Sequence, residues 1–141
     1  IRPKCLLGHR AQINLITSAI DASFVYGSTK QQANKLRTFS EGKMKVWNYF
    51  EELKLKPLLP PKLEEPDKDC LARPKDLFCF EAGDVRVNEQ THLTVLHTIY
   101  LREHNRIAKQ LAKINLEWDD ERIYHETRHI VAACVQHVAV N

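Results

Sequence analysis

The chain has 141 residues, of which 43% are hydrophobic, and carries a formal net charge of +3. This length suits one compact domain with a modest core. Basic residues are spread among the acids rather than gathered in blocks, which disfavours a nucleic-acid-binding protein, and no apolar run approaches the roughly 18 residues of a membrane span.

The start of the chain bears on its completeness. The first residue is Ile1 rather than methionine, and the first ten residues lack the apolar core of a signal peptide. We therefore expect a processed product, an excised domain or an incomplete sequence.

The region from residue 10 to residue 26 combines a helical spacing with oxygen-bearing side chains. Isoleucines recur at steps of three and four, which predicts a short helix, at Ile13, Ile16 and Ile20. Thr17, Asp21 and Ser23 are interleaved with them, and hydroxyls and carboxylates are ligands that calcium prefers. One carboxylate is few for a calcium site, so a turn capped by the same side chains is the alternative.

Two contrasting segments follow. Residues 29–37 have a helix-forming composition and are expected to pack as a short helix through Ala33 and Leu36. Residues 40–65 are charged and interrupted by prolines, which predicts a meandering surface connection with room for one short hairpin at 43–49. This segment is either a plain connection or the place where substrate access or partner binding differs between related proteins.

The longest helical pattern begins near residue 89. Its apolar residues recur at helical spacing and should be buried: Leu93, Leu96, Tyr100, Ile107, Leu111 and Ile114. Asn88 is the expected N-cap, which places Glu89 in the first turn, where the helix dipole favours an anion. Arg86 precedes Glu89 by three residues, so a guanidinium and a carboxylate can flank one pocket. A surface ion pair beside a capped helix is the alternative.

A second long helix is predicted from an N-cap at Asp119 to about Val138, as an antiparallel neighbour of the first. Its apolar face is predicted to contain Ile123, Thr127, Ile130, Val131 and Cys134. Cys134 is therefore expected to be a buried thiol.

The other cysteines have no CxxC spacing, which disfavours a structural zinc site. Cys70 and Cys79 bracket a polar loop that contains proline, where a short disulfide can form in an oxidising compartment. Cys5 is expected to need a partner upstream of the chain.

The predicted second helix also contains a competing motif, HETRH, at residues 125–129. It fits H-E-x-x-H, which places two zinc-binding histidines on one helical face with a glutamate as general base. The glycine and the third histidine of the extended motif are replaced by Ala132 and Val135. Zinc proteolysis is therefore a minor alternative.

Several stretches together resemble the animal haem peroxidase family: GDVRVNEQ at 83–90, the following LHTIYLREHNRIA, TSAIDAS at 17–23 with VYGS, and WDDERIY at 118–124. The resemblance implies an all-α fold, with residues 1–141 as an internal segment of a single peroxidase domain. It also implies a haem-dependent peroxidase that reduces hydrogen peroxide and oxidises a halide, a phenol or a tyrosine as donor. A local Cys70–Cys79 bridge matches the family.

The resemblance assigns roles to the residues of the GDVRVNEQ stretch. Arg86 matches the arginine that polarises bound peroxide, and Glu89 matches the carboxylate that forms an ester with a haem methyl group. Gln90 replaces a methionine that forms a sulfonium link to the haem in one member, so Gln90 lies near the haem without that link.

The resemblance also assigns a calcium site. Its ligands would be the side chains of Thr17, Asp21 and Ser23 and the carbonyl of Ala19. A further aspartate of the family's site has no counterpart in this sequence.

Cofactors implied by the resemblance are covalently linked haem b and calcium, and the partners are hydrogen peroxide and a small or protein-bound electron donor. The location implied is secreted or extracellular, including a secretory granule or the matrix. The family's distal and proximal histidines have no match here, so residues 1–141 alone are expected to be a poor peroxidase. A non-enzymatic interaction module derived from a peroxidase is the second hypothesis, and haem binding discriminates the two.

Overall fold

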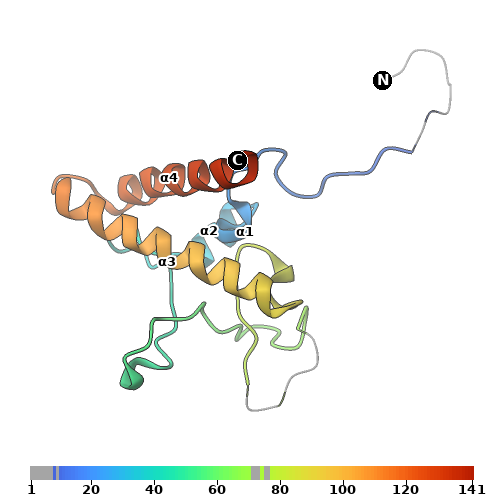
Figure 1. Ribbon diagram of the computed structural model, residues 1–141, viewed down its shortest axis with the longest axis horizontal. Helices are drawn as coiled ribbons and strands as arrows, with labels where there is room; N and C mark the ends of the chain where they lie inside the picture. Colours follow the sequence, from blue (N-terminus) through green and yellow to red (C-terminus); the bar gives the residue numbers. More distant parts are fainter. Residues whose placement is uncertain (1–7, 9, 71–73, 75–76) are drawn as a thin grey trace.

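The computed structural model describes residues 8, 10–70, 74 and 77–141. Its helices are α1 (Ser23–Tyr26), α2 (Lys30–Leu36), α3 (Thr91–Ile114) and α4 (Asp120–Val140), with 3-10 turns η1 (Glu51–Leu53) and η2 (Val85–Asn88) (Figure 1). Within the described residues, β-structure is limited to isolated antiparallel bridges. The all-α prediction is confirmed.

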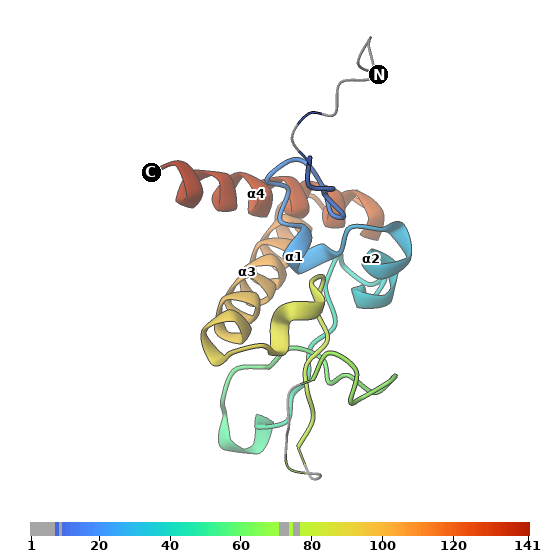
Figure 2. The ribbon, with the colours of Figure 1, turned by 90° about the vertical axis from the view of Figure 1, so that its right-hand side faces the viewer.

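The two long helices, α3 and α4, form a V-shaped hairpin. The chain direction is roughly opposite in the two helices, which meet at the turn that joins them and diverge toward the start of α3 and the end of α4 (Figures 1 and 2). Asp119 caps α4 as predicted, because its carboxylate accepts a hydrogen bond from the Arg122 amide at 2.8 Å. In the part of the chain that the structure describes, no helix is long and apolar enough to cross a membrane.

The core lies between this hairpin and the short helices α1 and α2. At its centre His104 bonds to the Tyr26 hydroxyl through Nδ1 and to the Gly42 carbonyl through Nε2, each at 2.8 Å. The ring of Tyr124 from α4 packs edge-on against Tyr26. One histidine therefore joins three segments that are distant in sequence.

Residues 40–65, predicted to be a surface connection, are partly packed into the core. Met44 and Leu59 are buried, and the Met44 backbone exchanges two hydrogen bonds with the Asn105 amide group, at 2.8 and 3.0 Å. The expected hairpin at 43–49 is replaced by single bridges, Arg37 to Met44 and Trp47 to Leu58.

Residues 10–22 form no helix, contrary to the prediction from their isoleucine spacing. Ile13 is 83% exposed, and Ile16 and Ile20 are exposed as well. A helix of this length is marginal in water unless an apolar face is buried, and none of these three side chains is buried.

The buried face of α3 matches the predicted stripe in part. Ile107 is buried as predicted, and Leu93, Tyr100 and Leu111 are half-buried, but Leu96 and Ile114 are exposed. The other buried positions are His97, Leu101, His104 and Ala108. Two buried positions are histidines, which a count of apolar residues does not include.

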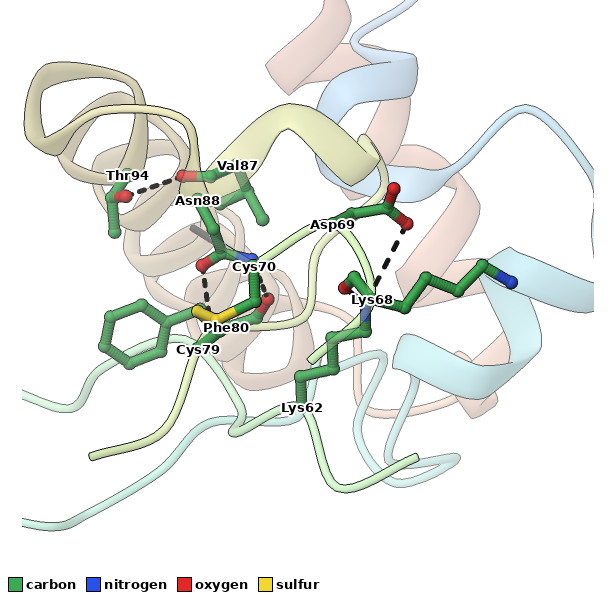
Figure 3. The surroundings of a disulfide bond; sticks show 9 residues. All are labelled: Lys62, Lys68, Asp69, Cys70, Cys79, Phe80, Val87, Asn88 and Thr94. Carbon is green, nitrogen blue, oxygen red and sulfur yellow. Dashed lines mark hydrogen bonds and ion pairs between the residues drawn. A yellow bond between two sulfur atoms is a disulfide. The ribbon is translucent and has the colours of Figure 1, made fainter. Parts of the chain in front are cut away.

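The predicted disulfide between Cys70 and Cys79 is present and holds the segment that leads into η2 (Figure 3). Cys134 is exposed on α4, so the prediction of a buried thiol is wrong. Cys5 lies outside the described residues.

Candidate functional site

Arg86 lies on η2, and its position is set by Asp84. The Asp84 carboxylate accepts a hydrogen bond from the Arg86 amide at 2.9 Å, and from the Arg86 side chain at Nε (3.0 Å) and Nη2 (2.6 Å). These bonds lower the pKa of Asp84 and raise that of Arg86, so both groups stay charged at neutral pH. The Arg86 side chain is 58% exposed. The result is a fixed cation that a ligand can reach.

Asn88 fastens this turn instead of capping α3. Its amide group exchanges two 2.8 Å hydrogen bonds with the backbone of Phe80, the residue after Cys79 (Figure 3). The predicted cap is therefore wrong: α3 begins at Thr91, and its N-cap Gln90 makes no side-chain capping bond. Glu89 precedes the helix instead of lying in its first turn, and both Glu89 and Gln90 are exposed.

The loop before α1 gathers the four predicted calcium ligands, Thr17, Ala19, Asp21 and Ser23. Thr17 Oγ1 donates to Asp21 Oδ1 at 3.0 Å and lies 3.0 Å from Ser23 Oγ. The Ala19 carbonyl lies 3.5 Å from the same hydroxyl. We call these four residues the oxygen cluster. The Ser23 amide donates to Asp21 Oδ1 at 2.9 Å, which fixes the carboxylate at the start of α1.

An open cleft of about 320 Å³ lies between the oxygen cluster and residues 84–90, which we call the arginine turn. Ala19, Asp21 and Ser23 line one part of it, and Asp84 and Arg86 line another. Glu89 and Gln90 are not among its lining residues. The structure thus brings Arg86 and three of the four predicted calcium ligands to one cleft, whereas Thr17 does not line it. The predicted haem-contacting residues lie on the exposed surface next to the cleft.

The HETRH histidines do not converge on a third ligand in the described structure. His125 Nε2 pairs with Glu121 at 3.0 Å, and His129 lies 4.0 Å from Glu126. Among the residues described, no three His, Cys, Asp or Glu side chains are grouped to hold a metal ion. The zinc hypothesis therefore gains no structural support.

Two residues of the cleft, Gly83 and Asp84, were not singled out from the sequence. Asp84 had a local signal, because an aspartate side chain often accepts a hydrogen bond from the backbone amide two residues later and so forms an Asx turn. Gly83 had none, since its role is a contact with the distant helix α1.

Comparisons with known proteins identify the family of the chain. A family model described as animal haem peroxidase matches residues 1–141. The chain is 42% identical over 139 residues to chorion peroxidase of Aedes aegypti, covering 99% of this chain and 17% of that protein. It is 45% identical over 131 residues to a peroxidasin homolog of Mus musculus, covering 92% and 9%, respectively. Lactoperoxidase of Mesocricetus auratus is 43% identical over 130 residues, covering 90% and 18%.

Solved structures show the same fold. Peroxidase A from Dictyostelium discoideum superposes with a TM-score of 0.78 at 33% identity, covering 89% of this chain and 24% of that one. A fatty acid alpha-dioxygenase of Arabidopsis thaliana reaches 0.63 at 23% identity, covering 83% and 15%, which shows similarity of fold alone. The chain spans less than one fifth of the length of the curated relatives named above. By the family match and these identities, the chain belongs to the animal haem peroxidase family.

Proposed function

We propose that these residues form the arginine side of a haem peroxidase site, with a calcium site beside it. The protein would reduce hydrogen peroxide while oxidising a halide, a phenol or a tyrosine. The main support is the exposed guanidinium of Arg86, which Asp84 holds in a cleft that three residues of the oxygen cluster also line. Residues 1–141 would be an internal segment of a single peroxidase domain.

The exposed surface beside the cleft fits a haem group in its chemistry. Ester formation needs a carboxylate that a second molecule can reach, and Glu89 is exposed. Beyond it, α3 exposes the apolar side chains Val95, Leu96 and Ile99, which suit an apolar ring. Bound haem would supply the redox chemistry. Glu89 would hold it by an ester, and Gln90 would contact it without a covalent link.

Arg86 would act through its charge. Cleavage of a peroxide O–O bond develops negative charge on oxygen, and a fixed donor aimed at that charge lowers the barrier. Because Asp84 already orients the guanidinium, little reorganisation is needed when a ligand binds.

Replacing Arg86 by alanine tests this role. We expect Arg86→Ala in the full natural protein to slow peroxide consumption by about 10²-fold, the usual effect of losing one such donor, while haem content is retained. Arg106→Ala is the matched control, because Arg106 is 55% exposed and forms a similar two-bond pair with Glu103, outside the cleft. Equal rates for the two variants, measured by stopped-flow, would refute the role of Arg86.

The oxygen cluster fits calcium in its donor chemistry. Calcium takes oxygen ligands at 2.3–2.6 Å, so neighbouring ligands lie about 3 Å apart, as do the oxygens around Thr17 Oγ1. We expect Asp21→Asn to abolish calcium binding in a titration by calorimetry. Asp119→Asn is the control, because asparagine also caps α4. Calcium binding by Asp21→Asn at unchanged affinity would contradict the assignment.

A secreted or extracellular location completes the proposal. The Cys70–Cys79 disulfide supports it, because such bonds persist in oxidising compartments.

A further inference from the structure

Gly83 lies where a side chain would collide with the backbone of α1. A Cβ at this position would come within 2.2 Å of the Gly27 nitrogen, 2.5 Å of the Ser23 carbonyl oxygen and 2.7 Å of the Tyr26 nitrogen. These distances are shorter than the separations that close-packed atoms allow. The chain before η2 therefore touches α1 backbone to backbone.

The atoms that Gly83 touches are the ones that close α1. The Gly27 amide donates to the Ser23 carbonyl at 2.7 Å, and both atoms of this hydrogen bond lie against Gly83. Ser23 also belongs to the oxygen cluster, through its hydroxyl and its amide. A shift of the Ser23 backbone would therefore disturb the oxygen cluster and the Gly83 contact together.

On its other side, Gly83 is joined directly to Asp84. Asp84 holds the backbone and the guanidinium of Arg86, and Val87 in the same turn is buried. The path from the oxygen cluster to Arg86 thus runs through Ser23, Gly83 and Asp84 by direct contacts or covalent bonds.

We propose that Gly83 is a positioning residue that couples cation binding at the oxygen cluster to the conformation of the arginine turn, residues 84–90. The inference rests on the calcium site proposed above. A cation would draw the cluster oxygens toward itself and fix Ser23, and the packed contact would transmit this order to Asp84 and Arg86. Because coupling is reciprocal, a change at Gly83 must also alter calcium affinity, although Gly83 supplies no ligand.

Two glycine variants in the full natural protein test the coupling. Gly83→Ala places a methyl group against α1, and Gly42→Ala is the matched control. A Cβ at Gly42 would come within 2.6 Å of Ile123 and 2.7 Å of the Tyr124 nitrogen, a similar clash, but against α4. We expect Gly83→Ala to weaken calcium binding on the order of tenfold and Gly42→Ala by less than about twofold, by calorimetry. Equal weakening by both variants would overturn the proposal.

A measurement on the unmutated protein keeps the test independent of how the variants fold. Hydrogen–deuterium exchange is compared in calcium and in a chelator. We expect calcium to slow exchange in residues 17–27 and also in residues 84–90. Protection confined to residues 17–27 would reject the coupling and leave the calcium site standing. No protection and no calorimetric binding would reject the calcium site, and the coupling with it.

Discussion

Lowering the pH should destabilise the protein through His104. This side chain is fully buried, and its Nε2 faces only the Gly42 carbonyl, so Nε2 must carry the proton. Nδ1 then accepts from the Tyr26 hydroxyl. Both nitrogens of the neutral ring are satisfied, and a second proton would place a charge on a buried ring. Burial, with a smaller effect from Arg37, lowers the pKa of His104 from 6.5 to about 4.

The sign and size of the effect follow from this pKa. Between pH 6.5 and 4 the unfolded chain binds a proton at His104 that the folded protein excludes, so stability falls as pH decreases. From pH 7 to pH 5 the loss at this residue is about 2 kcal/mol. Burial also lowers the pKa of His97, which adds to the loss in the same direction.

Urea unfolding followed by far-UV circular dichroism measures this loss at pH 7, 6 and 5. His104→Gln removes the titrating group, so the variant should be less stable at pH 7 but should lose about 2 kcal/mol less than the unmutated protein on acidification. The measurements stop at pH 5 because Arg37 lowers the pKa of Glu121 from 4.5 to about 2. Below pH 5 this carboxylate would also contribute to the loss of stability. The same pH dependence in both proteins would refute the reasoning.

Two further predictions concern a buried cation and a covalent link. Arg37 is buried, pairs with Asp120 and Glu121 at 2.8 and 2.7 Å, and lies 3.9 Å over the Tyr124 ring, so Arg37→Ala should lower the free energy of unfolding by about 3–5 kcal/mol. In the same urea assay Arg122→Ala, on the exposed side of α4, should change it by less than about 0.5 kcal/mol, and a loss no larger for Arg37→Ala would contradict the prediction. Glu89→Gln should release haem into acidified organic solvent while the unmutated protein retains it, and equal release from both would rule out the ester.

The helices that were predicted correctly begin at local signals. Thr29 accepts a hydrogen bond from the Gln32 amide at 3.2 Å and caps α2, and Asp119 caps α4 in the same way. Such caps depend on residues three positions apart, so the sequence alone contains them. α4 accordingly begins where it was predicted to begin, whereas α3, whose N-cap makes no side-chain capping bond, begins at Thr91 instead of Glu89.

The wrong predictions depended on contacts that local spacing does not contain. Asn88 had the right side chain for a cap, but its partner is Phe80, which the disulfide segment brings back to the turn. Cys134 was assigned to the apolar face of its helix, but the neighbouring positions that pack against the core are Val131, Ala132 and Val135, and Cys134 is exposed. Periodicity shows that a helix has a face, whereas tertiary contacts decide how far along the helix that face is buried.

The candidate site shows the same division. Spacing placed Arg86 near Glu89, and the family resemblance supplied the calcium ligands, but neither indicated that Arg86 and three of these ligands share a cleft. That arrangement requires the GDVR stretch to approach α1 more closely than any side chain allows, which only glycine permits at residue 83. Asp84 then converts this approach into a fixed direction for the guanidinium of Arg86. A larger residue at 83 would move the arginine turn, and a neutral residue at 84 would loosen it, so the position of Arg86 depends on both neighbours.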